Sequence, residues 1–255
     1  MDSLAVIAGF GVGAIVGMTG IGGGSLMTPL LLSVFKLNPA VAIGTDLWFA
    51  AITKMSGSVA HHRHGNVDYG ITGRLLAGSI PASIATIGLM HFTGITKGWA
   101  SALTFALGIA LLLTAVTVAY RQAWTAVGLR LERHVTDARR PALTVAAGAV
   151  LGVLVSLSSI GAGAIGATLI LLLYPRIEAR RVVGTDIAHA VPLTLVAGIG
   201  HATLGHVNWE LLVALLFGSI PGIWFGAQLT RRMPDALVRA LLCVALVTAG
   251  LKVVN

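Results

Sequence analysis

Gly44-Thr45-Asp46 recurs in the second half of the chain as Gly184-Thr185-Asp186, and Gly78-Ser79-Ile80-Pro81 recurs at the same offset as Gly218-Ser219-Ile220-Pro221. Between these two motifs three single residues also return, namely His61, Gly65 and Val67 as His201, Gly205 and Val207. The two halves align over this region without a gap. The duplication therefore predicts a chain built from two copies of one structural repeat.

Composition predicts a membrane protein. Hydrophobic residues make up 56% of the 255 residues, charged residues only 10%, and the mean hydropathy is +0.91, whereas soluble domains contain about 25% charged residues. Three uncharged runs, at 75–96, 98–120 and 211–230, each reach the ~20 residues that a membrane-spanning helix needs. Many secondary transporters are duplicated apolar chains of this kind, with the substrate held where the repeats meet.

The remaining compositional features exclude other classes. The net charge of +8 comes from Lys and Arg residues that lie mostly between the apolar runs, where membrane topology explains them better than nucleic-acid binding does. Cys243 is the only cysteine, so no intramolecular disulfide is possible. The N-terminus has Asp2 and no basic region, and we expect no cleaved signal peptide.

Two longer uncharged runs do not fit a single crossing. Residues 4–35 and 142–174 contain 32 and 33 residues, and one helix of that length would extend roughly 48 Å. Small residues interrupt both runs near the middle, as Gly20-Ile21-Gly22-Gly23-Gly24-Ser25 in the first and Ser158-Ser159-Ile160-Gly161-Ala162-Gly163 in the second. Because glycine destabilises helix interiors, we expect each run to form two half-helices joined by a turn.

The basic residues indicate whether a broken run crosses the membrane or turns back, because Lys and Arg accumulate on the cytoplasmic side. If both runs cross, the Lys and Arg residues between spans divide seven against eight, which favours neither orientation. If both turn back, they divide three against twelve, and the smaller set is Lys36, Lys97 and Lys252. The count predicts inverted repeats, with both termini outside.

The expected fold is therefore an all-α polytopic membrane protein of two inverted repeats, each a broken re-entrant helical hairpin plus three transmembrane helices. The first repeat is expected over residues 1–120 and the second over 141–255. Residues 121–140 form a cytoplasmic linker in which Glu132 and Asp137 lie among arginines. A solvated loop, a surface helix and a lipid-binding or regulatory patch all fit this composition.

The glycine breaks predict a site for a small anion. A half-helix that begins near Ser25, in the middle of the membrane, directs free backbone N–H groups and the positive end of its dipole at whatever lies before it. Transporters hold carboxylates in this way, and the same physics suits sulfite, sulfate or a sulfonate. The expected substrate-binding residues are Gly22, Gly23, Gly24, Ser25, Ser158, Ser159, Gly161, Gly163 and Lys54. The alternative is close helix packing through small residues, which we favour for Gly218, Gly222 and Gly226.

Ionisable residues within the spans need an explanation, because each costs ~2.5–3.5 kcal/mol in hydrocarbon. Lys54 either supplies positive charge to the anion pathway or is paired structurally. Asp46 and Asp186 either couple transport to protons or pair with neighbours such as Arg180 and Arg181. His61 and His201 end their spans at equivalent places, as a proton relay or gate or as interfacial hydrogen-bonding groups.

Several of these motifs together resemble the sulfite exporter TauE/SafE family, also known as the toluene-sulfonate uptake permease family. They are Gly22-Gly23-Gly24 followed by Pro29, the stretch His61 to Asp68 with its echo at 201–208, and the doubled Gly-Ser-Ile-Pro. The resemblance covers residues 4–251. It implies a secondary carrier of small anions, mostly sulfur oxyanions and organosulfur acids such as sulfite, sulfoacetate and sulfonates.

The function expected from the sequence is thus anion transport by alternating access in a bacterial inner membrane, with no cofactor and no nucleic-acid partner. Coupling to H⁺ or Na⁺ stays open. One alternative is a divalent-metal carrier, although His61, His62 and His64 lack the partners and spacing of a metal site. The other is an intramembrane enzyme with Ser25 as nucleophile beside a histidine.

Overall fold

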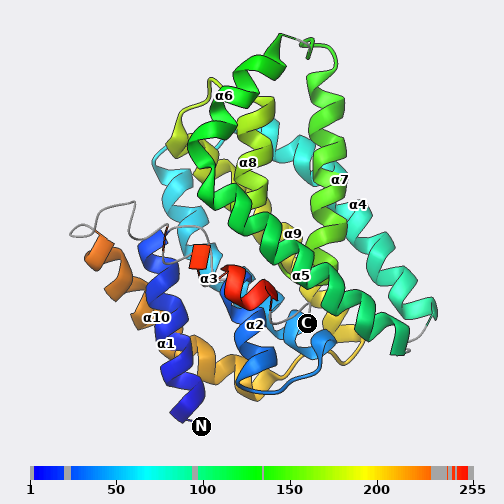
Figure 1. Ribbon diagram of the computed structural model, residues 1–255, viewed down its shortest axis with the longest axis vertical. Coiled ribbons are helices and arrows are strands. Elements are labelled where there is room, and N and C mark those ends of the chain that lie inside the picture. Colours follow the sequence, from blue (N-terminus) through cyan, green and yellow to red (C-terminus); the bar gives the residue numbers. More distant parts are fainter. Residues whose placement is uncertain are drawn as a thin grey trace.

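The computed structural model describes residues 3–19, 24–93, 97–133, 135–230, 240, 243–244 and 246–251. Among these residues the secondary structure is entirely helical (Figure 1). The helices are α1 (Ser3–Thr19), α2 (Gly24–Ser33), α3 (Pro39–Arg63), α4 (Tyr69–Thr93), α5 (Lys97–Ala119), α6 (Arg121–Glu132), α7 (Arg140–Ser158), α8 (Ala164–Leu173), α9 (Ala179–Thr203) and α10 (Trp209–Thr230).

Five helices within the described residues are long and apolar enough to cross a membrane, which confirms the membrane prediction. They are Tyr69–Thr93, Ser101–Ala119, Arg140–Ser158, Ala179–Thr203 and Trp209–Gly226. Helix α3 has the same length as α9, 25 residues, or about 37 Å. Helix α3 contains Asp46 and Lys54 and ends with His61-His62-Arg63. Both α3 and α9 therefore have the length of a spanning helix.

The helix boundaries repeat along with the sequence. Helices α8 and α9 begin and end at the positions that correspond to the ends of α2 and α3 in the gapless alignment of the two halves.

The contacts between helices show that α1 and α7, the first helix of each half, are shifted by one residue relative to this alignment. A Cβ on Gly78 would lie 1.9 Å from the carbonyl oxygen of Val145, and a Cβ on Gly218 would lie 1.9 Å from that of Val6. Since the gapless alignment places Val6 opposite Ala146 and not Val145, it does not extend to α1 and α7.

Each half packs its first helix against the other half. Helix α1 lies along α10, and α7 lies along α4 (Figure 1). The backbones approach so closely that Gly218, Gly222 and Gly226 of α10 have no room for a Cβ against Val6, Phe10 and Ala14 of α1. Small residues permit this kind of contact between membrane helices. The packing interpretation of these three glycines is confirmed.

Polar caps fix where α4 and α10 begin. The side chain of Asp68 accepts hydrogen bonds from the backbone N–H groups of Gly70 and Ile71, at 3.0 and 3.1 Å, and thereby caps α4. Asn208 caps α10 in the same way through Leu211 N, at 3.0 Å. Such caps satisfy backbone donors that have no partner within the helix. The turns before α4 and α10 are therefore matched structures, and they carry the doubled sequence stretch.

The second broken run turns back on itself. Tyr174 follows α8, and its hydroxyl lies 2.8 Å from the hydroxyl of Thr144 near the start of α7. The guanidinium of Arg140 lies 5.7 Å from the centre of the Tyr174 ring. Because the end of α8 contacts the start of α7, the chain returns to the side from which α7 began.

The connection between the halves contains a packed helix. Gly128 of α6 approaches α8 so closely that a Cβ would lie 2.6 Å from the carbonyl oxygen of Leu171. Glu132, at the end of α6, forms salt bridges with Arg176 at 3.0 Å and with Arg140 at 3.8 Å. The connection therefore contains a helix and not only a solvated loop, while a lipid-binding or regulatory role of its arginines stays a prediction.

Helices α3 and α9 form the centre of the molecule, and apolar side chains face outward on the other helices. Ile43 and Leu47 of α3 are buried against Ala190, Leu193 and Ala197 of α9. Several large apolar side chains of the outer helices are at least 60% exposed. This is the pattern expected of a surface that faces lipid. These side chains include Ile7, Phe92, Phe105, Val150 and Trp224.

Candidate functional site at the crossing of α3 and α9

The doubled Gly-Thr-Asp motif joins the two halves. Gly44, near the start of α3, lies against His201 and His206, near the end of α9, where a Cβ would be 1.9 Å from the carbonyl oxygen of His206. Gly184, near the start of α9, lies against Asn66 in the turn after α3, where a Cβ would be 2.2 Å from the carbonyl oxygen of Asn66. The beginning of each helix therefore meets the end of the other, and α3 and α9 run in opposite directions.

The threonine of each motif fixes the same contact by a hydrogen bond. The backbone N–H of Asn208 donates to Oγ1 of Thr45, and that of Asp68 donates to Oγ1 of Thr185, both at 3.0 Å. Both threonines are fully buried. Each turn thus uses its capping residue, Asp68 or Asn208, to bind the motif of the opposite half.

The aspartate of each motif points into the centre. Asp46 is fully buried, and one of its carboxylate oxygens accepts a hydrogen bond from the hydroxyl of Thr28 in α2. The Ser159 hydroxyl lies near the same carboxylate. Asp186 is only 3% exposed and faces the backbone N–H of Gly163 at the start of α8. The N-terminal end of α8 is therefore occupied by a carboxylate of the protein itself, in agreement with the attraction of a helix N-terminus for negative charge.

Lys54 lies between the two carboxylates and the second break. The side chain is 7% exposed, and its ammonium donates a hydrogen bond of 2.5 Å to the carbonyl oxygen of Ala162. It interacts electrostatically with both Asp46 and Asp186. The structure thus brings together five of the residues expected to have a function, and they form the central cluster: Asp46, Lys54, Ser159, Gly163 and Asp186.

The second break has the irregular backbone that a turn between half-helices requires. Ser159, Gly161 and Gly163 have φ values of 59°, 130° and 143°, and the last two favour glycine because L side chains rarely adopt them. The Ser158 hydroxyl binds within the turn, to the carbonyl oxygens of Leu154 at 2.7 Å and Ile160 at 3.2 Å. Ser158 therefore stabilises the turn, while the Ser159 hydroxyl is buried without a hydrogen-bond partner among the described residues.

The first break falls mostly outside the described residues. Gly22 and Gly23 lie in the segment 20–23, which is not described, and Gly24 is the first residue of α2. Ser25 belongs to α2, but its side chain is also outside the described part. The expected contribution of these four residues to an anion site stays a prediction.

His61 and His201, the two histidines near the ends of α3 and α9, lie apart from the central cluster and from each other. His201 is fully buried, and its Nε2 donates to the carbonyl oxygen of Ser156 at 2.9 Å. Its Nδ1 lies 3.3 Å from Nδ1 of His206, so in the neutral pair His206 must be the donor. Burial lowers the pKa of His206. His61, at the end of α3, lies beside Gly184 on the opposite half.

One of the two arginines considered as partners of the aspartates, Arg181, pairs with a different carboxylate. Arg181 forms a salt bridge of 3.4 Å with Asp68, and both side chains are partly exposed. This pair lies where the turn before α4 meets α9. In the other half the equivalent residues are Val41 and Asn208, so the turn before α10 docks without this ion pair. The structure therefore pairs Asp46 and Asp186 with Lys54 and not with Arg181.

Sequence reasoning missed His189. The ring is fully buried in α9, its Nε2 lies 3.0 Å from the hydroxyl of Ser79 in α4, and it faces Lys54 electrostatically. The available signal was asymmetry between the repeats. Phe49 takes the place of His189 in the other half, and Ser219 takes the place of Ser79. The equivalent positions therefore cannot form the same hydrogen bond.

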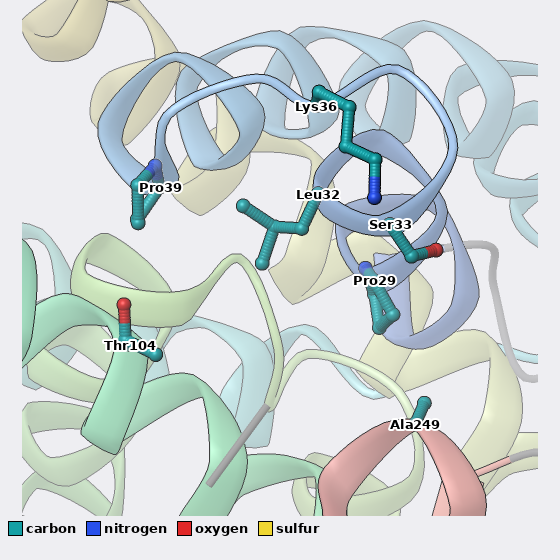
Figure 2. Close-up of a pocket in the computed structure, with 7 residues that line it drawn as sticks. All are labelled: Pro29, Leu32, Ser33, Lys36, Pro39, Thr104 and Ala249. Atoms are coloured by element: carbon teal, nitrogen blue, oxygen red, sulfur yellow. The ribbon is translucent and has the colours of Figure 1, made fainter. Parts of the chain in front are cut away.

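A cavity of about 340 Å³ lies on the other face of α2. Figure 2 shows Lys36, with φ of 53°, on its wall beside Ser33 and Leu32. Pro29 also lines this cavity, whereas the preceding residue, Thr28, contacts Asp46. Helix α2 therefore separates a cavity with one cationic side chain from the central cluster.

The described residues contain no group of three or more His, Cys, Asp or Glu side chains that is suited to hold a metal ion. The central cluster has two carboxylates, but Lys54 lies where a second cation would compete with it. The described side chains thus favour charge compensation by lysine over metal coordination at the centre.

Comparison with known proteins finds relatives that are membrane transporters by name. The family model described as sulfite exporter TauE/SafE matches residues 5–253. The chain is 36% identical over 258 residues to the probable membrane transporter protein YjnA of Bacillus subtilis, covering 98% of both chains. It is 29% identical to the probable membrane transporter protein YdhB of the same organism, covering 97% of this chain and 98% of that protein. No solved structure matches the chain.

Proposed function

The chain belongs to the sulfite exporter TauE/SafE family of membrane transporters, and we propose that its substrates are small anions, above all sulfite and organosulfur acids such as sulfonates and sulfoacetate. The observation that carries this proposal is the position of Lys54. A buried ammonium at a break between half-helices offers positive charge beside the Ser159 hydroxyl, which has no described partner. A sulfonate or sulfite oxygen accepts hydrogen bonds from such groups.

The anion lies beside Lys54 and Ser159, next to the break at residues 158–163, in this proposal. An anion bound there would take over part of the compensation of the Lys54 charge that Asp46 and Asp186 now provide. The first break, at residues 22–25, contributes backbone N–H groups from the opposite side. The two breaks thus enclose the anion between the halves.

Transport proceeds by alternating access between two inverted repeats, over residues 1–120 and 141–255, joined by the linker at 121–140. The opposite directions of α3 and α9 support this arrangement, as does the return of α8 to the start of α7. The distribution of basic residues favours both termini outside the bacterial inner membrane and the linker in the cytoplasm. The turns that bind Thr45 and Thr185 lie at opposite ends of the α3–α9 pair. In this proposal the two contacts break and re-form in alternation as the site opens to one side of the membrane and closes to the other.

The test is solute flux into proteoliposomes that contain the purified protein. Labelled sulfite, sulfoacetate and ethanesulfonate are compared with Ni²⁺ and Co²⁺, with empty liposomes as the blank. At least one of the sulfur anions should exchange faster than in empty liposomes, and the metal ions should not. Flux of the metal ions alone would refute the proposal in favour of a cation carrier, and no flux of any solute would refute transport of these substrates.

A matched pair of lysine variants tests the position of the site. Lys54→Gln should reduce anion flux by about 10- to 100-fold, because hydrogen bonds to a charged group contribute about 1.5–3 kcal/mol. Lys36→Gln removes a lysine from the cavity beyond α2 and should leave most of the flux. Since Lys54→Gln leaves two buried carboxylates without their cation, Lys54→Arg serves as the variant that keeps the charge. Equal losses for Lys36→Gln and Lys54→Gln would place the anion elsewhere.

A further inference from the structure

The central cluster contains buried polar atoms that nothing in the described part of the chain satisfies. Oδ1 of Asp46, Oδ1 of Asp186 and Nδ1 of His189 are all buried without a hydrogen-bond partner. These three side chains are at most 3% exposed. A buried polar atom without a partner is costly. Three of them in one cluster indicate a place where something binds and leaves again.

The charges of the cluster do not balance without an additional positive charge. Asp46 and Asp186 carry two negative charges when both are ionised, and Lys54 supplies one positive charge. One buried carboxylate is then uncompensated, which proteins rarely tolerate. An incoming anion adds a further negative charge at the same place. The cluster therefore accepts an anion more readily when a cation binds with it.

A proton fits this requirement better than Na⁺ does. Hard metal cations bind several oxygen atoms at once, and the Ala162 carbonyl at the break already accepts from Lys54. No three acidic or histidine side chains among the described residues converge as metal ligands. A proton needs only one of the two unpartnered carboxylate oxygens.

We propose that the Asp46–Asp186 pair holds one exchangeable proton and that each anion crosses the membrane together with that proton. The inference rests on the anion transport proposed above and names its coupling ion. The proton comes from water on one side, forms an O–H bond with a carboxylate oxygen of the pair, and is released to water on the other side. Because the two carboxylates share Lys54, the proton belongs to the pair and not to either residue alone.

The groups that face this pair come from every neighbouring element. Thr28 of α2 and Ser159 of the break lie at Asp46, and the Gly163 amide lies at Asp186. Lys54 faces both carboxylates and His189, and His189 is held by Ser79. Two further buried histidines, His201 near the end of α9 and His206 in the turn after it, lie apart from the pair. They contact each other, and His201 donates to the carbonyl oxygen of Ser156 in α7.

The decisive experiment uses ethanesulfonate, because this anion stays charged at every pH at which the protein is stable. Proteoliposomes loaded with the pH dye pyranine receive external ethanesulfonate at equal internal and external pH. The lumen should become more acidic as the anion enters. With an acidic exterior, the final accumulation should rise about tenfold for each pH unit of the gradient, because one proton moves with each anion. A potassium–valinomycin potential should leave the rate nearly unchanged, because a proton and a monoanion together carry no net charge.

Variants identify the carrier of the proton. Asp46→Asn and Asp186→Asn each leave one carboxylate as the permanent counter-ion of Lys54. Any anion flux that remains should be insensitive to the pH gradient and should acquire sensitivity to the membrane potential. Asp137→Asn changes an exposed carboxylate of the linker, 94% exposed, and should keep full coupling. An infrared band of a protonated carboxyl group, present in the detergent-solubilised wild type and absent from the Asp186→Asn and Asp46→Asn variants, reports the same proton without any transport.

The outcomes separate this inference from the proposed function. Ethanesulfonate flux without lumen acidification, with a requirement for Na⁺ or with a strong response to the membrane potential, would overturn proton coupling while leaving anion transport intact. Alkalinisation of the lumen would indicate exchange of the anion for a proton and would also overturn it. If none of the anions moves in the wild-type protein, the proposed function fails and the coupling fails with it.

Discussion

Replacing Gly44 by alanine tests whether the turn before α10 docks onto α3. A Cβ at this position would lie 1.9 Å from the carbonyl oxygen of His206, and real Cβ atoms are essentially never closer than 3.0 Å to another heavy atom. The turn must therefore move away from α3, and the contact atom is backbone that has no rotamer to change. Overpacking of this kind costs about 1–3 kcal/mol, and the gain in helix propensity offsets about 0.5–1 kcal/mol of it. The net loss should therefore lie between about zero and about 2.5 kcal/mol.

The matched control is Gly88→Ala in α4, because nothing lies within 4 Å of a Cβ at Gly88. That variant should gain the helix propensity alone. For a chain of this length 1 kcal/mol corresponds to about 2–4 °C in Tm, so Gly44→Ala should melt several degrees below Gly88→Ala in detergent. Anion flux should also fall in Gly44→Ala, since the displaced turn binds Thr45. If Gly44→Ala melts at the same temperature as Gly88→Ala and transports normally, α3 and the turn before α10 are not in contact as described.

Paired positions in the two halves give three further predictions. Ser79→Ala leaves Nε2 of the buried His189 without its partner and should lower stability by about 1–3 kcal/mol. Ser219→Ala removes a hydroxyl that has no described partner and should change Tm little. Equal Tm losses for the two variants would contradict the Ser79–His189 contact. Burial lowers the pKa of His206 below its ordinary value of 6.5, so the unfolded chain binds more protons in acid. Acidification should therefore lower stability by at most about 1.4 kcal/mol per pH unit for this ring. His206→Asn, which copies Asn66 of the other half, should lose less Tm than the wild type between pH 7.5 and pH 5.5, and an identical loss would argue against a buried His206. Arg181→Val, which copies Val41, breaks only a partly exposed salt bridge with Asp68 and should lower the free energy of unfolding by less than about 1 kcal/mol. A larger loss of stability would contradict the description of this pair as a partly exposed surface salt bridge.

The apolar runs and their interruptions were readable from the sequence because they depend on local composition. The uncharged runs at 75–96, 98–120 and 211–230 became α4, α5 and α10, and the small residues at 158–163 became the turn between α7 and α8. Helix α4 begins at Tyr69, ahead of the uncharged run, because Asp68 caps it there.

The contacts between the halves were not readable, because they depend on residues that lie far apart in the chain. Gly44-Thr45-Asp46 was recognisable as a repeat, but its role needs the turn at 204–208, whose backbone it binds. His189 escaped notice because a histidine among apolar residues shows no pattern of its own. Comparing the two halves residue by residue, with Phe49 opposite it, would have found it.

The most direct test of the account is the location of a bound sulfonate. In a structure of the protein with 2-bromoethanesulfonate, determined with data that reveal the bromine by anomalous scattering, the account predicts one ligand whose sulfonate oxygens contact Lys54 and Ser159 beside the break at 158–163. A ligand seated instead in the cavity lined by Lys36, or a central cluster that stays sealed around Asp46, Lys54 and Asp186 at saturating ligand, would contradict it.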